Sequence, residues 1–496
     1  MIINQSFSSL FANPSIKNIV IIGMGHAGAE IYREIIEKRP TWKVVGFVDD
    51  FVDQKKINFP KNVKQPRYLG AIKDLKKILK EKSCDLLIIA IEHASRELLS
   101  KIIDIFSPNK QILSIIPAEG ETLKGNTRLE NLREVKAQDL IGRRTLSIDN
   151  SAIKKTLQGK TILVTGAGGS IGSELCKQLL SYPIKNILAL SRGEHSLFFL
   201  KEKIENENPK DKRVIYLIGD VLDRQRLNEI CKGHSIDFVF HAAAHKHVPL
   251  MEMHPGEAFK NNVLATKNLL QLCTEKKIKN FVFISTDKAV NPTTVMGASK
   301  RIAELLTKTY HTQKKLCTSI VRFGNVISSR GSVVPLFQRQ IRNNGPITVT
   351  HPKCKRFFMT ITEAATLVIE TVALSTENIK NFKGSTYMLD MGKAISIDKL
   401  VQMMIKLYGH IPGKTIDINY IGLRPGEKLH EELSSKNDTL MQTSNKHIYT
   451  ISEPTTKLKT IREKISTIEK KLKNLSTKQM RDILLKTALS FQSKEK

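Results

Sequence analysis

The stretch KTILVTGAGGSIGSELCKQLL, residues 160–180, decides the fold. Its apolar run TILVT (161–165) predicts a buried strand, which a glycine-rich turn joins to a helical pattern. The first glycine of the GxxGxxG spacing allows the turn, the second lets backbone N–H groups approach a pyrophosphate, and the third lets the helix pack on the strand. The residues assigned to this dinucleotide site are Gly166, Gly169, Ser170, Ile171 and Gly172.

Further apolar runs follow this turn at the intervals of a doubly wound α/β sheet. They are NILALSR, VIYLIGDV, IDFVFHAAA, FVFISTDK and SIVRFGNV. Upstream, KNIVII (17–22) enters a second glycine-rich turn (23–28). We therefore expect two Rossmann-like parallel sheets in tandem, with a small substrate cap built from the turn-rich segments after Asn343.

The expected domain organisation has three parts. Residues 1–150 form an N-terminal Rossmann-like domain, 151–450 the catalytic domain with its cap, and 451–496 a basic helical tail. In the first domain the turn is GMGHAG, and the next strand ends in Asp49 and Asp50, where a ribose-binding acid would lie. Two interpretations stay open: this domain binds a nucleotide, or it is a scaffold whose glycines serve tight packing.

The end of the second strand in the catalytic domain bears on the choice of cofactor. NAD sites place Asp or Glu there, whereas this chain has Ser191 and Arg192, which suit a 2′-phosphate. The prediction is NADP, with NAD as the alternative. Asp220 and Val221 are expected to border the adenine, and small residues are expected on the floor of the site. These floor residues are Ala242, Ala243 and Ala244.

Composition limits the class of protein. The chain has 496 residues, 41% hydrophobic and 26% charged, with a formal charge of +31 and no run of eighteen apolar residues. We expect a cytoplasmic protein without a transmembrane segment. Six cysteines without CxxC spacing predict reduced thiols and no metal site. Because no nucleic-acid module accompanies the lysine excess, we expect no nucleic-acid partner.

The lysine-rich tail from about Thr455 has Ile and Leu at helical spacing. It would either contact an anionic membrane or a partner peripherally, or form a solvated helical pair that packs on the domain.

The stretch STDKAVNPTTVMGASK (285–300) follows an apolar run and precedes a helical pattern. Ligands bind at the carboxyl ends of strands in open α/β sheets, so Thr286, Asp287 and Lys288 would project into the crevice. Met296 and Lys300 lie four residues apart, on one face of the helix.

Taken together, several motifs resemble the capsule-type nucleotide-sugar 4,6-dehydratases of the polysaccharide biosynthesis family, within the extended short-chain dehydrogenases. The similarity is dense from about Gly159 to Leu433. The long members of that family begin with transmembrane helices, which we expect this chain to lack. The motifs are TGAGGSIGSEL, HAAAHKHVPLME, NNVLATKNL, STDKAVNPTTVMGASKR, VRFGNVISSRGSVVPLF, THPKCKRFFMT and LRPGEKLHEEL.

The resemblance implies that a nucleotide sugar such as UDP-N-acetylglucosamine becomes a 4-keto-6-deoxy sugar. Asp287 would then protonate the departing 6-hydroxyl, Lys288 would be the base at C5, and Thr286 would bond the 4-hydroxyl. Lys300 would hold the nicotinamide ribose. Relatives commonly have Tyr at position 296, and a methionine cannot take a proton. Either a water or Asp287 would accept the C4 proton.

For Lys288 to act as a base its pKa must fall, which burial beside a cationic nicotinamide and Lys300 would promote. Arginines in the cap would meet a diphosphate. The residues predicted to bind substrate are Lys246, Asn262, Asn325, Arg330, Ser332, Arg356, Arg424 and Glu427.

Two competing functions remain open beside the dehydratase. One is a 4-epimerase or ketoreductase on the same site, and the other is a non-catalytic nucleotide-binding regulator. By analogy with short-chain relatives, which pair through helices, we expect a homo-oligomer.

Overall fold

The computed structural model describes residues 16–50, 66–91, 94–106, 111–116, 129, 132–141, 150–314, 316–377, 385–452 and 459–491. This part of the chain divides into two compact units. Unit 1 comprises residues 1–147, 336–349 and 397–420, and unit 2 comprises residues 148–335, 350–396 and 421–496.

Unit 1 contains a parallel sheet in the order β3-β2-β1-β4-β5, and β6 adds an antiparallel edge strand. Its central strands are almost fully apolar and buried, as expected for strands with helices on both faces. The elements in chain order are β1 (Asn18–Ile22), α2 (His26–Lys38), β2 (Lys43–Val48), β3 (Tyr68–Gly70), η1 (Ile72–Asp74), α3 (Leu75–Glu81), β4 (Leu86–Ile89), α4 (Arg96–Ile105), β5 (Ile112–Ile115), β6 (Arg133–Glu134) and η3 (Asp139–Ile141).

Segments from much later in the chain complete unit 1. Helix α15 (Ile397–Leu407) packs on α4, and Lys406 forms an ion pair of 2.5 Å with Asp104 across this contact. Strands β14 (Ile347–Val349) and β19 (Ile418–Tyr420) pair in parallel. Helix α13 (Val333–Arg342) enters this unit at residue 336.

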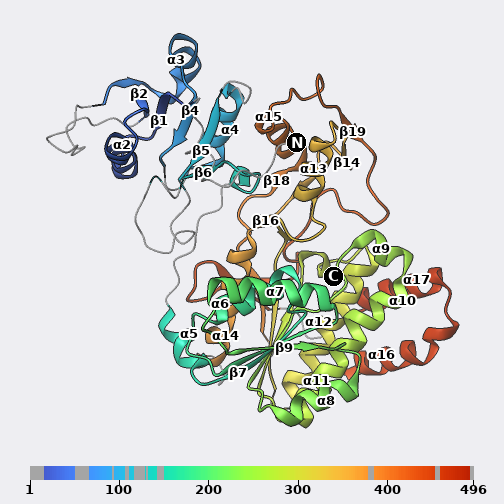
Figure 1. The fold of residues 1–496 in the computed structure, drawn as a ribbon. Helices are drawn as coiled ribbons and strands as arrows, with labels where there is room; N and C mark the ends of the chain where they lie inside the picture. Colours follow the sequence, from blue (N-terminus) through green and yellow to red (C-terminus); the bar gives the residue numbers. More distant parts are fainter. Residues whose placement is uncertain are drawn as a thin grey trace. The chain divides into compact units, whose positions relative to one another are not determined.

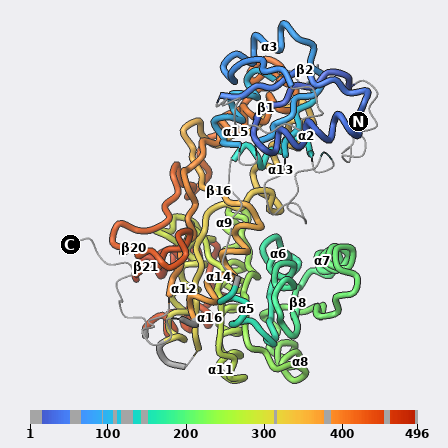
Figure 2. Tube along the Cα trace, turned by 90° about the vertical axis from the view of Figure 1, so that its left-hand side faces the viewer, coloured from blue at the N-terminus to red at the C-terminus, as the bar shows by residue number. Residues whose placement is uncertain are grey.

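Unit 2 is built on a sheet that, among the described residues, has nine strands in the order β20-β21-β17-β12-β11-β10-β7-β8-β9. The strands from β17 to β9 are parallel, and β21 and β20 continue the sheet in antiparallel pairing. Figure 2 shows β20 and β21 next to each other. The strands are β7 (Thr161–Thr165), β8 (Asn186–Ser191), β9 (Val214–Ile218), β10 (Phe238–His241), β11 (Asn280–Ile284), β12 (Cys317–Arg322), β17 (Ser385–Leu389), β20 (Thr439–Gln442) and β21 (Ile448–Ser452).

Helices cover both faces of this sheet (Figure 1). Helices α5, α6 and α14 pack together on one face, and α8, α11 and α12 bury the main apolar cluster on the other. Their bounds, with the remaining helices, are α5 (Asn150–Leu157), α6 (Ser170–Leu179), α7 (Glu194–Glu207), α8 (Arg224–Gly233), α9 (Val248–Met253), α10 (Pro255–Ala258), η4 (Phe259–Leu264), α11 (Ala265–Glu275), η5 (Asp287–Ala289), α12 (Val295–Lys314) and α14 (Ile361–Glu377).

Two short strand pairs lie in the loops outside this sheet. They are β13 (Asn325–Val326) with β16 (Phe358–Met359), and β15 (Lys355–Arg356) with β18 (Ile395–Ser396). The two parallel sheets confirm the predicted α/β class with tandem Rossmann-like units.

The tail folds into α16 (Lys459–Lys471), η7 (Leu472–Asn474) and α17 (Thr477–Leu489). Ile461, Ile465 and Leu484 of this pair lie in the same buried cluster as residues of α11 and α12. The apolar face of the tail therefore packs against the rest of unit 2, in agreement with the interpretation of the tail as a solvated helical pair.

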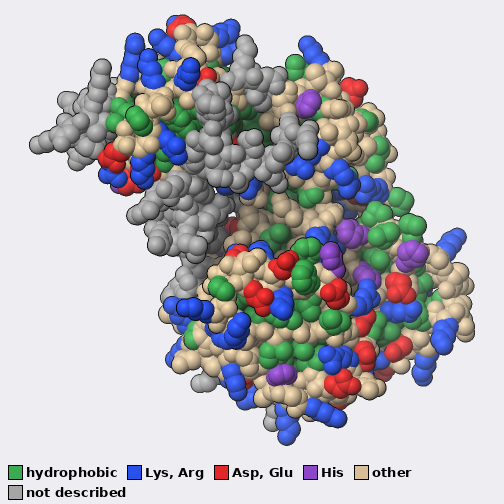
Figure 3. All heavy atoms as spheres, in the orientation of Figure 1, with side chains coloured by type: hydrophobic (Ala, Val, Ile, Leu, Met, Phe, Trp, Pro, Cys, Tyr) green, Lys and Arg blue, Asp and Glu red, His purple; other side chains and the backbone are tan. Residues whose placement is uncertain are grey.

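The surface charge is dispersed over the visible face of unit 2, where Lys and Arg side chains are interspersed with Asp and Glu (Figure 3). All six cysteines are free thiols. Within the described ranges, no helix is both long and apolar enough to span a bilayer.

Candidate active site

The glycine-rich turn between β7 and α6 requires glycine at two positions for different reasons. Gly166 has a φ of +66°, which favours glycine, and a Cβ on Gly172 would lie 2.2 Å from the Gly166 carbonyl oxygen. Gly169 is the N-cap of α6, whose first residues are Ser170 and Ile171. The predicted residues therefore meet in one turn that leaves backbone N–H groups at the helix N-terminus for an anion.

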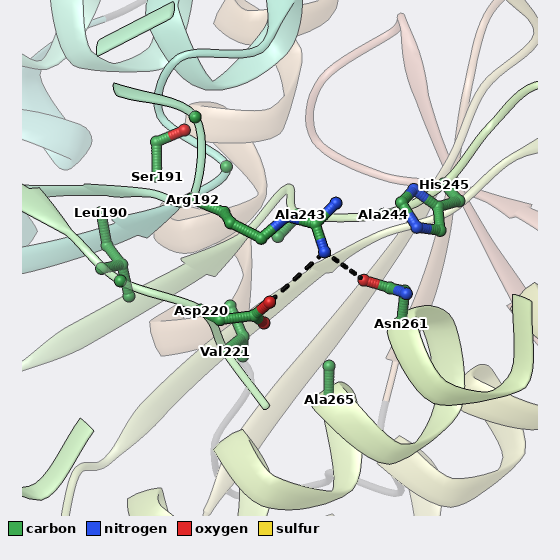
Figure 4. Close-up of a pocket in the computed structure, with 13 residues that line it drawn as sticks. Leu190, Ser191, Arg192, Asp220, Val221, Ala243, Ala244, His245, Asn261 and Ala265 are labelled. Carbon is green, nitrogen blue, oxygen red and sulfur yellow. Dashed lines mark hydrogen bonds and ion pairs between the residues drawn. The ribbon is translucent and has the colours of Figure 1, made fainter. Parts of the chain in front are cut away.

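A cavity of about 210 Å³ opens beside this turn at the ends of β8, β9 and β10 (Figure 4). Arg192 reaches across it: its Nη1 donates to Asp220 Oδ2 at 3.3 Å and to Asn261 Oδ1 at 3.5 Å. The lining residues that the sequence predicted are Gly166, Ser191, Arg192, Asp220, Val221, Ala243 and Ala244, and those it missed are Leu190, Gly193, Gly219, His245, Asn261 and Ala265.

Ala242 does not line the cavity, although its backbone lies against the turn: a Cβ on Gly166 would lie 2.9 Å from the Ala242 carbonyl carbon. The missed Asn261 sits in the π-helical turn η4, which no apolar spacing predicts. Small residues around the turn, a cavity at the ends of three parallel strands and a free helix N-terminus fit a bound dinucleotide.

Polar side chains after β11 form the second part of the site. Both the Thr286 hydroxyl and the Lys288 ammonium donate to Asp287 Oδ1, each at 2.9 Å. Lys288 Nζ also donates to Asn325 Oδ1 at 3.0 Å. The Asp287 side chain is fully buried, and its Oδ2 has no hydrogen-bond partner in the described chain. This oxygen faces Gly324, where a Cβ would lie 3.2 Å away.

A second carboxylate, which the sequence reasoning did not select, approaches the same lysine. Glu431 Oε1 lies 3.7 Å from Lys288 Nζ and 4.0 Å from Arg356 Nε, and its side chain is 6% exposed. Glu431 was within the quoted LRPGEKLHEEL motif, but nothing in the spacing distinguishes it from Glu432, which bonds Asn291 and Lys428 instead.

The pKa of Lys288 differs from the expectation. Burial lowers the pKa of Lys288, but the negative charges of Asp287 and Glu431 outweigh burial, so its pKa is raised above the ordinary value. The expected decrease is therefore wrong for the protein groups alone. Burial also raises the pKa of Glu431, while the charges of Lys288 and Arg356 oppose that rise.

Helix α12 places Met296 and Lys300 beside this group. Met296 is 4% exposed and belongs to the apolar cluster, so it offers no polar group to a substrate. Lys300 donates to the carbonyl oxygen of Ile284, and its Nζ lies 3.9 Å from the ring centroid of Phe283. Burial lowers the pKa of Lys300 to about 7, and Glu304 partly counteracts this. Lys300 can therefore exchange a proton near neutral pH.

Among the predicted substrate residues, one group forms an ion-pair cluster next to Lys288. Arg356 Nη2 donates to Glu427 Oε1 at 2.7 Å, and the Arg424 backbone N–H donates to Glu427 Oε2 at 3.2 Å. Asn325 joins through Lys288. These residues lie together, as expected for one end of a substrate site.

Other predicted substrate residues have different surroundings. Lys246 Nζ donates to Ser329 Oγ at 3.4 Å, and burial together with Arg330 lowers the pKa of Lys246. The Arg330 backbone N–H donates to Ser170 Oγ at 3.1 Å, which ties this loop to the glycine-rich turn. Ser332 Oγ is buried with no hydrogen-bond partner among the described residues.

Asn262 is occupied by the protein itself. Its Oδ1 accepts from the His245 N–H at 2.8 Å, and its Nδ2 donates to the His245 carbonyl and to Ser299 Oγ. With 1% exposure it holds the loop after β10 in place. Its role is therefore to fix the loop that contains His245, and its amide is not available to a substrate.

Comparison with known proteins supplies the family. Residues 162–453 match the model of the family described as polysaccharide biosynthesis protein. The capsular polysaccharide biosynthesis protein CapD of Staphylococcus aureus is 39% identical over 435 residues, covering 87% of this chain and 71% of that protein.

Two further relatives have names that state a reaction. The UDP-N-acetylglucosamine 4,6-dehydratase (inverting) of Campylobacter jejuni is 34% identical over 60% of this chain and 84% of its own. The UDP-glucose 4-epimerase of Rickettsia bellii is 34% identical over 56% of this chain and 79% of its own. Because the family model spans more than half of the chain and CapD matches across both units, the chain belongs to the polysaccharide biosynthesis protein family.

Proposed function

We propose that the protein is a nucleotide-sugar 4,6-dehydratase that converts UDP-N-acetylglucosamine, or a related UDP- or dTDP-hexose, to its 4-keto-6-deoxy form for surface polysaccharide or glycan synthesis. One observation carries the proposal: a buried acid, a lysine and a hydroxyl share hydrogen bonds at the end of β11. An elimination across C5 and C6 requires an acid and a base on adjacent carbons, and this cluster offers both.

A nicotinamide, when bound, supplies a reversible hydride acceptor that turns C4 of the sugar into a ketone and later returns the hydride to C6. The chain's part is to hold that group. The glycine-rich turn would receive the pyrophosphate, and the cavity at Arg192 the adenosine. Lys300, near the N-terminus of α12, would hold the nicotinamide ribose.

The preferred form is NADP, with NAD as the alternative. A guanidinium has five N–H donors, so Arg192 can keep its bonds to Asp220 and Asn261 and still take a 2′-phosphate. Substituting Arg192→Ala should weaken NADP at least about tenfold and leave NAD unchanged by calorimetry. Lys201→Ala is the matched control, because it removes one positive charge from the exposed side of α7 and should leave the binding of both cofactors unchanged. Tighter binding of NAD than of NADP by the unaltered protein would favour the alternative.

Oxidation at C4 releases the 4-hydroxyl proton, and position 296 has no phenol to accept it. The Thr286 hydroxyl already donates to Asp287 Oδ1. A 4-hydroxyl that bonds to Thr286 can therefore pass its proton through this hydroxyl to Asp287. Asp287 then holds the proton that O6 needs when it departs as water.

The C4 ketone acidifies the C5 proton, so a modest base suffices there. Lys288 is 21% exposed, whereas Asp287 beneath it is fully buried. Lys288 would therefore reach C5, take its proton, and return it after hydride reaches C6. The atoms balance: one water leaves, and the sugar gains no net electrons.

The charged groups near this cluster suit a diphosphate. Arg356, Arg330 and Arg424 would bind the phosphates, with Lys246 near the sugar, and Asn325, Ser332 and Glu427 would contact its hydroxyls.

The test is incubation of the purified protein with UDP-N-acetylglucosamine and NADP or NAD, followed by mass spectrometry. The proposal predicts a keto sugar lighter by one water, and Asp287→Asn or Lys288→Met should each lower its rate about 100-fold or more. Glu432→Gln is the control for removal of a nearby carboxylate from the same loop. No keto sugar with any UDP- or dTDP-hexose would end the proposal.

The alternatives make different predictions in the same assay. A 4-epimerase gives a product of unchanged mass, and the epimerase relative keeps this reading open. It is disfavoured because Met296 is buried and apolar and because an epimerase needs no acid–base pair at C5 and C6. A non-catalytic regulator would bind nucleotide and keep its cellular role after Asp287 and Lys288 are both replaced.

A further inference from the structure

The ion-pair cluster around Lys288 contains an unequal number of charges. Its carboxylates are Asp287, Glu427 and Glu431, and its cations are Lys288 and Arg356. Two of the three carboxylates have a short partner: Asp287 bonds Lys288 at 2.9 Å, and Glu427 bonds Arg356 at 2.7 Å. Glu431 is the carboxylate in excess.

Glu431 has long ionic contacts, at 3.7 Å to Lys288 and 4.0 Å to Arg356, and its side chain accepts no shorter hydrogen bond from the described residues. Lys428, the next cation along this loop, bonds Glu432 and the carbonyl of Val290, and its charge also opposes the rise in the pKa of Glu431 without a direct bond to that carboxylate. A buried carboxylate without a short partner is costly to keep ionised. Burial therefore raises the pKa of Glu431 and favours its protonated form.

Lys288 has the opposite difficulty. It donates to Asp287 and to Asn325, and two carboxylates lie within 4 Å of its nitrogen. These neighbours favour the ammonium, which cannot accept a proton from C5. If Lys288 is the base of the proposed reaction, another group has to take its proton first.

We propose that Glu431 is the proton partner of Lys288, a relay residue that acts through the lysine and does not touch the sugar. The inference rests on the proposed function for its chemical step. The ammonium gives one proton to the Glu431 carboxylate, which leaves an amine and a carboxylic acid. The amine takes the C5 proton, returns it after hydride reaches C6, and then recovers its own proton from Glu431.

The contact of 3.7 Å is longer than a hydrogen bond, so transfer requires a small side-chain rotation or one bridging water. Asp287 cannot serve instead, because in the proposed cycle it holds the proton destined for O6. Glu427 cannot either, because Arg356 and Thr350 bond its Oε1.

The first test needs no sugar. Competitive acetylation of Lys288, followed across pH by mass spectrometry, reports when the amine becomes free. In Glu431→Gln the loss of one negative charge should make Lys288 reactive at lower pH than in the unaltered protein. Glu432→Gln should leave the profile unchanged. Coincident profiles for the unaltered protein and Glu431→Gln would show that the two groups are not coupled, and would overturn the inference.

The second test uses turnover of UDP-N-acetylglucosamine. Glu431→Gln should still reduce the nicotinamide at C4, seen by its absorbance, but should form keto-deoxy sugar about 100-fold more slowly near neutral pH. Its rate should recover only at higher pH, where Lys288 has already lost its proton to the solvent. If its kcat instead reached the normal plateau with the acid limb moved to lower pH, Glu431 would be only a counter-charge, and the relay would be wrong.

Failure of the proposed function gives a different pattern. In that case the unaltered protein makes no keto sugar, while the acetylation profiles still decide whether the two groups are coupled. Should Glu431→Gln not fold, Glu431→Ala with added formate replaces it: recovery of elimination by formate supports the relay, and no recovery in a folded protein opposes it.

Discussion

The buried carboxylate of Glu304 gives the sharpest prediction about how the site is held. Its two oxygens accept from Arg322, Nε to Oε1 at 2.8 Å and Nη2 to Oε2 at 2.6 Å. Oε1 also accepts from Ser285 at 2.6 Å, and Oε2 from Arg301 at 3.1 Å. Glu304 and Arg322 are 0% and 2% exposed, so neither charge is solvated by water.

Replacing Glu304 with Gln keeps the shape but removes the charge and one of the acceptor oxygens. The amide NH₂ would then face donors of Arg322 or Arg301. Breaking a buried pair from one side costs about 3–5 kcal/mol, because the remaining charge stays buried. We expect a loss of this size in the free energy of unfolding of unit 2, together with slower turnover because Ser285 adjoins Thr286.

Hydrogen exchange of peptides from β11, β12 and α12 is the suitable assay, because the single tryptophan, Trp42, lies in unit 1 and reports on another part of the chain. Glu304→Leu combined with Arg322→Met removes the two most buried charges and should recover part of the loss, because Arg301 still loses its contact with Glu304. A loss below about 1 kcal/mol in Glu304→Gln would refute the reasoning, since that is the size of an exposed pair.

Three further predictions concern the turn, the acid and the lysine of α12. Gly172→Ala puts a Cβ 2.2 Å from the Gly166 oxygen, so calorimetry should show cofactor binding at least about tenfold weaker. Gly324→Ala puts a Cβ 3.2 Å from Asp287 Oδ2 and should lower kcat about tenfold or more while cofactor affinity stays unchanged. Lys300 has a pKa of about 7 in the folded protein, against an ordinary value of 10.5. Between these two values the unfolded chain binds more protons than the folded chain. The free energy of unfolding therefore increases as the pH rises from about 7 to 10.5. Lys300→Met should therefore stabilise most below about pH 7 and progressively less toward pH 10 in urea titrations; an advantage that does not change with pH would contradict this.

Local patterns were sufficient to predict the strands and the cofactor turn. The centre of the run 161–165 is apolar because β7 is buried on both faces. The spacing of Gly166 and Gly172 follows from the close contact between them in one turn. Ser191, Arg192 and Asp220 were found because they follow strand ends, whose positions the same apolar runs predict.

Contacts between distant segments could not be predicted in this way. Glu431 approaches Lys288 across 143 positions of the chain only because the loop after β19 folds back on β15. The raised pKa of Lys288 follows from that contact and from Asp287. Asn262 was predicted to bind substrate on the strength of the family resemblance, but its amide bonds the backbone of His245. The packing of α15 on α4 is likewise a tertiary fact without a local signal.

The proposed reaction moves two protons over separate paths, and the cluster has two acid–base pairs to match. One proton goes from O4 to O6 without return, which suits Thr286 and the buried Asp287, because burial keeps that proton from exchanging with water. The other leaves C5 and comes back, which suits Lys288 as its carrier, while Glu431, 3.7 Å away, stores the lysine's own proton until the C5 proton has been returned. Exchange of solvent deuterium therefore separates the two paths. Product formed in D₂O should carry deuterium at C5, and Glu431→Gln should slow that incorporation, whereas Asp287→Asn should block the loss of water. If Asp287→Asn slowed C5 exchange alone, the assignment of the two pairs would have to be reversed.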